Sequence, residues 1–126
     1  TQQAAPGWWA GYNELAVATC ALGDSGTALE HFGRALQLAP DEIGVRAARA
    51  ECLYRTGDRV EAIRSAETLI QKYGDNPQLI DVYLCLGQWY TAAGDIALAE
   101  ELYERGLQLW PQAYWLQARL NELPGR

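Results

Sequence analysis

Apolar residues recur along most of the chain with the three- to four-residue spacing of amphipathic helices. The sequence contains no run in which apolar and polar residues alternate between hairpin turns, as they do in half-buried strands. We therefore predict helices only. Their expected positions are near residues 8–22, 27–39, 42–56, 59–73, 77–93, 96–109 and 112–122.

Two kinds of helix-breaking residue interrupt this pattern at a nearly constant interval. Three glycines, each leading into a polar stretch, recur at almost equal distances along the chain, and three prolines do the same. They are Gly23, Gly57 and Gly94, and Pro40, Pro77 and Pro111. A unit of about 34 residues with an internal glycine and a terminal proline is typical of a repeated helix-turn-helix pair.

The residues at the expected helix ends agree with this interpretation. Each of the three glycines follows an apolar-periodic segment, where a left-handed residue ends a helix. Asp58 and Asp95 follow two of these glycines, and we expect their side chains to cap the next helix. Asn76 and Pro77 read as an N-cap followed by proline at the first helical position.

The third unit matches a known repeat motif closely. Tyr83, Leu86, Gly87 and Tyr90 fall in the frame W-x-x-L-G-x-x-Y, and Ala99, Tyr103 and Pro111 follow in the frame A-x-x-x-F…P. On these residues the chain resembles tetratricopeptide repeats over roughly residues 9–113. The first unit matches through Tyr12, Leu15, Ala28, Phe32 and Pro40, whereas the second has Arg46 and Arg49 where bulky apolar residues are usual.

The resemblance implies an all-α fold, a right-handed α-solenoid of three antiparallel helix pairs. We expect repeats near residues 9–42, 43–79 and 80–113 in a single domain of residues 8–126, preceded by a flexible N-terminal segment of residues 1–7. A helix near residues 112–123 is expected to cap the third pair, because a terminal repeat needs a cover. The alternative is a truncated fourth repeat that leaves Trp115 and Leu116 exposed.

In such solenoids the first helix of each pair lines a concave face. The motif assigns the core side of this helix to Tyr12, Leu15 and Thr19 in the first unit, and to Tyr83, Leu86 and Tyr90 in the third. Helical geometry then defines the opposite face. This predicted partner-binding groove comprises Ala10, Asn13, Val17, Cys20, Ala47, Glu51, Tyr54, Asp81, Leu84, Gln88 and Thr91.

The groove residues are mostly small and apolar, which suits an amphipathic helix or extended peptide of a partner protein. Tyr54 and Leu84 are the expected anchors. The resemblance thus implies a protein-protein interaction module, a scaffold or adaptor part of a larger protein. The alternatives are a merely solvated face, or a structural spacer that forms a homodimer through its terminal aromatic residues. Those aromatic residues are Trp8, Trp9 and Trp115.

One specialisation of the family does not fit this chain. Chaperone-binding members hold a C-terminal carboxylate with Lys, Asn and Arg on the concave face. The matching positions here are Asn13, Val17, Ala48, Asp81 and Cys85. Only the asparagine fits, and Asp81 repels a carboxylate. We therefore expect no binding of acidic C-terminal peptides.

The composition argues against several other functions. The formal net charge of -6 argues against nucleic acid as a partner, because phosphate binding normally needs a basic face. No apolar run approaches the roughly 18 to 20 residues of a membrane span. The sequence offers no nucleophile–base pair and no phosphate-binding loop, so we expect neither an enzyme nor a cofactor site.

The three cysteines, Cys20, Cys52 and Cys85, are separated by nearly one repeat length each, and His31 is the only histidine. A zinc site needs about four closely grouped ligands, so we expect no metal. The spacing places the cysteines on comparable helical faces, where we expect small packed residues. Without an evident pairing they favour a reducing compartment. The segment 69–111 resembles repeats of bacterial envelope lipoproteins, which leaves a cytoplasmic or a periplasmic, envelope-associated location open.

Overall fold

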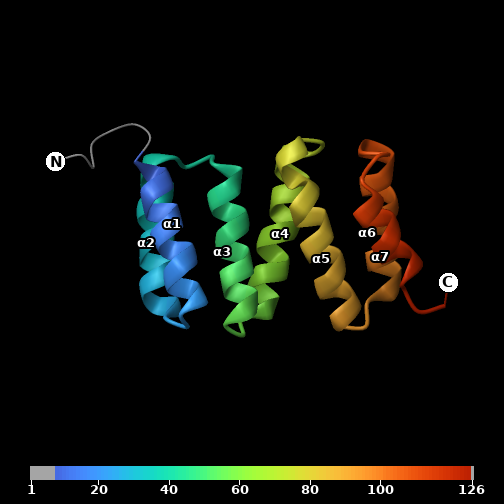
Figure 1. Ribbon diagram of the computed structural model, residues 1–126, viewed down its shortest axis with the longest axis horizontal. Helices are drawn as coiled ribbons and strands as arrows, with labels where there is room; N and C mark the ends of the chain where they lie inside the picture. The colour runs from blue at the N-terminus through green and yellow to red at the C-terminus, as the bar shows by residue number, and fades with distance from the viewer. Residues whose placement is uncertain (1–7, 126) are drawn as a thin grey trace. The chain divides into compact units, whose positions relative to one another are not determined.

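The structure, a computed structural model, describes residues 8–125; residues 1–7, expected to form the flexible N-terminal segment, lie outside the described part, as does residue 126. The described residues form helices and no strand, so the all-α prediction is confirmed. The helices, drawn in Figure 1, are α1 (Trp9–Ala21), α2 (Ser25–Leu38), α3 (Ile43–Arg55), α4 (Arg59–Tyr73), the 3₁₀ turn η2 (Pro77–Leu79), α5 (Ile80–Ala92), α6 (Ile96–Leu109) and α7 (Tyr114–Asn121).

Contacts divide the chain into two compact units, Thr1–Leu69 and Ile70–Arg126, with the boundary inside α4. In the first unit α1 packs against both α2 and α3, and α2 also packs against α3. Small and aromatic residues from all three helices form one core cluster, because small side chains let helix backbones approach closely. The cluster consists of Ala16, Cys20, Ala28, Phe32, Ala35, Val45 and Cys52.

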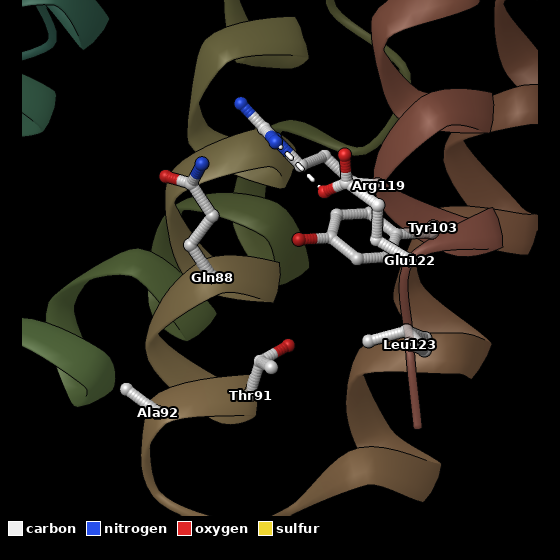
Figure 2. A pocket seen from close by; sticks show the side chains of 7 residues that line it. All are labelled: Gln88, Thr91, Ala92, Tyr103, Arg119, Glu122 and Leu123. Atoms are coloured by element: carbon white, nitrogen blue, oxygen red, sulfur yellow. Dashed lines mark hydrogen bonds and ion pairs between the residues drawn. The ribbon is translucent and has the colours of Figure 1, made fainter. Parts of the chain in front are cut away.

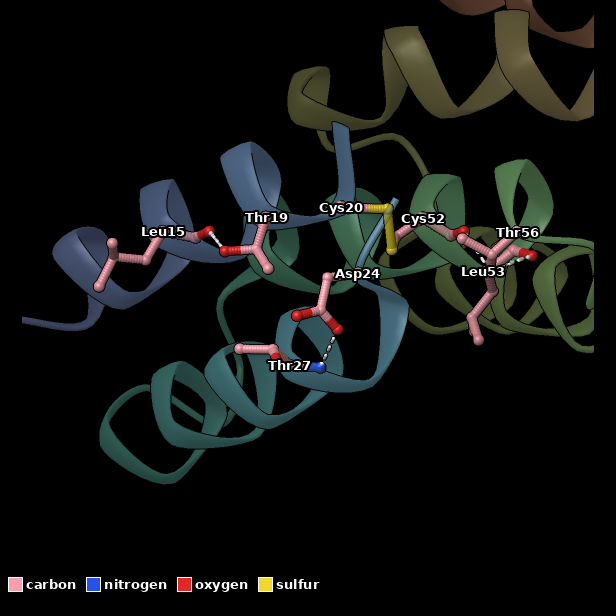
Figure 3. The surroundings of a disulfide bond; sticks show 8 residues. All are labelled: Leu15, Thr19, Cys20, Asp24, Thr27, Cys52, Leu53 and Thr56. Atoms are coloured by element: carbon pink, nitrogen blue, oxygen red, sulfur yellow. Dashed lines mark hydrogen bonds between the residues drawn. A yellow bond between two sulfur atoms is a disulfide. The ribbon is translucent and has the colours of Figure 1, made fainter. Parts of the chain in front are cut away.

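A disulfide joins Cys20 of α1 to Cys52 of α3, whose Cα atoms lie 6.0 Å apart (Figure 3). Our expectation of unpaired cysteines was therefore wrong. The two cysteines lie about one repeat apart on first helices that pack against each other, so similar register brings the Cα atoms within bridging distance. The argument for a reducing compartment, which rested on unpaired cysteines, falls with it.

In the second unit α5 packs against α6, and α6 packs against α7. Glycines allow both contacts. A Cβ atom on Gly87 would clash with the ring of Tyr103, and one on Gly106 would come within 2.8 Å of Leu116. Tyr83 and Trp110 add an edge-to-face pair with ring centroids 5.2 Å apart. Gly87 therefore has the packing role that the repeat motif implies.

The turns between helices follow the sequence signals in most respects. Gly23, Gly57 and Gly94 all have positive φ, of 94°, 106° and 86°, as predicted for residues that end helices. Asn76 accepts a hydrogen bond from the backbone N–H of Gln78 at 2.9 Å. The expected cap at Asp95 was wrong, because its side chain makes no capping hydrogen bond to α6.

Asp24, which the sequence analysis did not single out, caps α2 by accepting a hydrogen bond from the backbone N–H of Thr27 at 3.1 Å. Figure 3 shows this contact beside the disulfide. Hydrogen bonds from the side chain and the backbone N–H of Thr27 lower the pKa of Asp24. The charged carboxylate therefore stabilises the start of α2.

The predicted core side of the first helices holds in the second unit and only in part in the first, where Tyr12 packs against the core cluster. Tyr83, Leu86 and Tyr90 are buried in α5, as expected, with Leu86 only 1% exposed. At the matching position in α1, Leu15 is 52% exposed, so its assignment to the core was wrong. The physical reason is the orientation of α1, which faces α2 and α3 with Ala16 and Cys20 and turns Leu15 away from both.

The C-terminal helix α7 packs its apolar side inward. Leu116, Leu120 and Leu123 are buried, and Trp115 is half-buried. An exposed Leu116 was the mark of a truncated repeat, and it does not occur. The role of residues 112–123 as a cap, and the domain boundaries given above, stay predictions.

Candidate partner-binding face

In the first unit, a small hollow of about 40 Å³ lies between α1 and α3. These are the first helices of two successive pairs, so the hollow lies on the face where we predicted the groove. Val17 and Cys20 border it from α1, and Phe32 borders it from α2. From α3 it is lined by Ala48, Glu51, Cys52 and Arg55.

Three predicted groove residues border this hollow, but they differ in what they offer a partner. Val17 is 47% exposed and Glu51 is exposed, so both are open to contact. Cys20 is buried and bonded to Cys52. It contributes a disulfide sulfur to the wall of the hollow.

The other predicted groove residues of the first unit, Ala10, Asn13, Ala47 and Tyr54, are half-buried. The amide oxygen of Asn13 is buried and has no hydrogen-bond partner within the described chain. The guanidinium of Arg59 lies 5.0 Å from the centroid of the Tyr54 ring, a cation–π contact. Tyr54 is therefore partly covered by its own chain, which weakens its case as the main anchor.

In the second unit a larger cavity, of about 310 Å³, opens between α5 and α7 with α6 behind it (Figure 2). Gln88, Thr91 and Ala92 line it from α5, and Tyr103 lines it from α6. At the C-terminal end it is lined by Arg119, Glu122 and Leu123. Two predicted groove residues, Gln88 and Thr91, thus border a cavity with partners that we had not predicted.

The polar groups of this cavity are held by defined contacts. Arg119 Nη1 donates to Glu122 Oε1 at 2.8 Å, an exposed ion pair drawn as a dashed line in Figure 2. The hydroxyl of Thr91 donates to the carbonyl oxygen of Gly87 at 2.8 Å. Burial raises the pKa of the Tyr103 phenol. The phenol is therefore protonated at neutral pH.

The remaining predicted residues of the second unit do not border this cavity. Asp81 is exposed and Leu84 is half-buried, and both lie on α5 at earlier turns than Gln88. Leu84 is therefore partly accessible outside the cavity.

The cavity residues on α7 were missed because we treated this helix only as a cover. The signal was present in the spacing. Glu122 follows Gln88, and Arg119 follows Cys85, by the repeat length of about 34 residues that is typical of this motif. The helix α7 thus lies where the repeat spacing would place the first helix of a further pair. Extending the groove position of Gln88 by one more repeat length finds Glu122, whereas Arg119 corresponds to Cys85, which was not among the predicted groove residues.

Neither a metal site nor a membrane span is found in the part of the chain that the structure describes. Among residues 8–125 no three His, Cys, Asp or Glu side chains come together as metal ligands would. None of the described helices combines the length and the apolar character needed to cross a bilayer.

Comparison with known proteins agrees with this architecture. The family model "Tetratricopeptide repeat" matches residues 21–83, half of the chain, and the chain therefore belongs to the tetratricopeptide repeat family. Tetratricopeptide repeat protein 33 of Xenopus laevis is 27% identical over 84 residues, which cover 67% of this chain and 31% of that protein. The chain thus spans less than a third of this relative. Tetratricopeptide repeats are in general non-catalytic modules for protein-protein interaction.

Proposed function

We propose that this chain binds a peptide or helix of a partner protein on the first-helix faces of its repeats. These faces are formed by α1 and α3 in the first unit and by α5 and α7 in the second. The observation that carries the proposal is the position of the two hollows. Each lies between successive first helices, and predicted groove residues border each one: Val17 and Glu51 in one unit, Gln88 and Thr91 in the other.

The chemistry of these faces supports a peptide ligand. Exposed or half-exposed aliphatic groups such as Val17 and Leu84 provide apolar surface for partner side chains. Glu51 and Gln88, exposed beside the two hollows, supply polar groups for a bound segment. An apolar surface with a few polar groups to fix orientation is typical of peptide-binding grooves.

The proposal is tested with peptides selected by display against the folded chain and then titrated against variants. Leu84→Ala should weaken binding at least about fivefold, since truncating an interface anchor costs more than about 1 kcal/mol. The matched control is Leu98→Ala on α6, which removes the same atoms from a 46% exposed side chain on a second helix. Equal effects of the two substitutions would contradict binding on the first-helix face.

A second measurement addresses the type of peptide. We expect no measurable binding of peptides that end in acidic residues and a free carboxylate. Asp81 is exposed on α5 and repels such a ligand, and the matching positions Val17 and Ala48 offer no cation. Low-micromolar affinity for one of these peptides in a fluorescence titration would disprove this part of the proposal.

A further inference from the structure

The Cys20–Cys52 disulfide forms part of the wall of the hollow in the first unit. Both cysteines are nearly buried, with Cys20 4% and Cys52 3% exposed, and both line the hollow. The hollow has a volume of about 40 Å³, close to the roughly 30 Å³ that one water molecule occupies in the liquid. A group that occupies so small a hollow therefore lies against the disulfide.

The opposite walls of the hollow belong to the two helices that the disulfide joins. Val17 precedes Cys20 by three residues in α1, and Ala48 precedes Cys52 by four residues in α3. Residues with this spacing lie one above the other on the same side of a helix. The distance between α1 and α3 thus sets the distance between the walls, and the disulfide holds the two Cα atoms 6.0 Å apart (Figure 3).

Reduction changes this spacing and leaves the other contacts between the helices in place. Two thiols need more room than a disulfide, because sulfur atoms that are not bonded to each other stay at van der Waals distance. The helices α1 and α3 also pack against each other, and Ala16, Phe32 and Val45 belong to the core cluster of this unit. We therefore expect the walls of the hollow to shift when the bond is cut, while the helices remain.

We propose that the binding face of the first unit is redox-sensitive: thiols reach the disulfide through the hollow, and reduction weakens partner binding there. The reductant is a low-molecular-weight thiol such as glutathione. Its thiolate attacks one cysteine sulfur and forms a mixed disulfide, the S–S bond of the chain breaks, and the other cysteine takes up the proton that the reductant released. A second thiol attacks the mixed disulfide in the same way, so the chain ends with two thiols and the reductant ends as its own disulfide. The loss of partner binding rests on the proposed function, whereas the route to the disulfide does not depend on it.

The route is tested by the rate at which glutathione reduces the folded chain, followed by alkylation and mass spectrometry. Val17→Phe places a ring beside the hollow, whereas Ala18→Phe adds a ring at the next residue of α1, which is exposed and outside the lining. Val17→Phe should slow reduction at least about threefold, because thiol–disulfide exchange depends on access to the sulfur, and Ala18→Phe should not. Urea unfolding gives the stability of both variants. Equal rates, or rates that only follow the unfolding free energies, would mean that thiols reach the disulfide by unfolding and would overturn the route.

The effect on binding is measured with two classes of selected peptides, those weakened by Val17→Ala and those weakened by Leu84→Ala. The double variant Cys20→Ala with Cys52→Ala removes the bond without burying a new polar group. Peptides that depend on Val17 should bind this variant at least about fivefold more weakly, the lower end of typical coupling between two sites. Peptides that depend on Leu84 should bind both chains equally. Equal losses in the two classes, or no loss in the first, would overturn the redox-sensitive face.

A redox titration of the wild-type chain needs no variant that must fold. Because coupling between sites is reciprocal, a saturating Val17-dependent peptide should favour the disulfide by the same factor by which the bond favours the peptide. The square of the glutathione concentration divided by that of glutathione disulfide, at half-reduction, should rise by this factor. A Leu84-dependent peptide should leave the midpoint unchanged. An equal shift with both peptides would mean that the bond stabilises the whole chain, and would overturn a local effect.

The two proposals fail separately. Val17-dependent peptides that bind equally with and without the disulfide overturn the redox-sensitive face and leave the proposed function standing. Selected peptides that respond to neither Val17→Ala nor Leu84→Ala contradict the proposed function and the loss of binding built on it. The reduction rates of the two phenylalanine variants then still decide the route to the disulfide.

Discussion

Gly87 lies where the backbone of α5 meets the ring of Tyr103, and its missing side chain is what allows this contact. Gly33 in α2, by contrast, takes part in no close packing contact. It is exposed, it lies in the interior of the helix, and a Cβ atom placed on it would meet nothing within 4 Å. The same residue type is therefore required at one helical position and merely tolerated at the other.

This contrast predicts opposite effects of the same substitution. Gly87→Ala should destabilise the fold by about 1–3 kcal/mol, because the added methyl group overpacks a buried contact. Gly33→Ala should stabilise it by up to about 1 kcal/mol, because alanine restricts the unfolded chain and favours the helix. Urea unfolding of both variants measures these changes. A neutral Gly87→Ala would mean that Tyr103 moves aside at little cost.

At the scale of helices, the beginning of α2 and the junction of α1 with α3 are held by specific contacts. Asp24 caps α2 through Thr27, whereas Asp95 occupies the equivalent position before α6 without a side-chain hydrogen bond. The disulfide ties α1 to α3, which already pack against each other. Equivalent helices in the first and third repeats thus begin with different local interactions.

The Asp24 cap predicts a pH-dependent stability. Because its pKa is lowered in the folded state, the charged carboxylate contributes stability above about pH 4, the usual value for an unfolded aspartate. That contribution is lost as the pH falls from there through the folded pKa. Asp24→Ala should therefore destabilise the chain near neutral pH, and its difference from wild type should shrink below about pH 4. Thermal unfolding from acidic to neutral pH measures this, with Asp95→Ala as the control that changes little.

The disulfide predicts a large response to reductant. It closes a loop over a sequence separation of 32. A cross-link of that span stabilises by about 3–4 kcal/mol in the chain-entropy model. Reduction, or the change Cys52→Ser, should lower the unfolding midpoint accordingly, and Cys85→Ser should leave the response to reductant intact. Mass spectrometry of the non-reduced chain should show one disulfide, and three thiols in alkylation without reductant would contradict it.

At the scale of the whole molecule, the proposed self-association depends on how much aromatic surface the chain exposes at its ends. Trp8, Trp9 and Trp115 are all half-buried. Trp8 lies edge-to-face against Tyr12, with ring centroids 6.2 Å apart, and Trp115 lies against Tyr114 at 5.1 Å. The chain's own residues thus supply ring contacts for two of these tryptophans, which weakens the case for a homodimer through them.

We therefore expect a monomer in solution. Light scattering between about 5 and 200 µM, where weak interfaces begin to form, should give a mass near the 14.0 kDa of the chain. Trp8→Ala and Trp115→Ala should lower stability and leave this mass unchanged. A dimer that either substitution abolishes would restore the self-association hypothesis.

The sequence by itself determined the helices and their ends. Helical periodicity and turn glycines depend on neighbouring residues only, so the predicted positions of α1 to α7 agree with the structure to within a few residues. The buried residues of α5 could also be predicted from the sequence. Tyr83, Leu86 and Tyr90 match a motif whose spacing encodes the packing face directly.

Only the tertiary structure decided which faces and side chains come together. Leu15 and Leu86 occupy the same motif position, yet one is exposed and the other buried, because burial depends on which helices lie over each face. The pairing of Cys20 with Cys52 required the contact between α1 and α3. The cavity beside Gln88 combines residues of α5, α6, α7 and the segment after α7, which only the tertiary fold brings together.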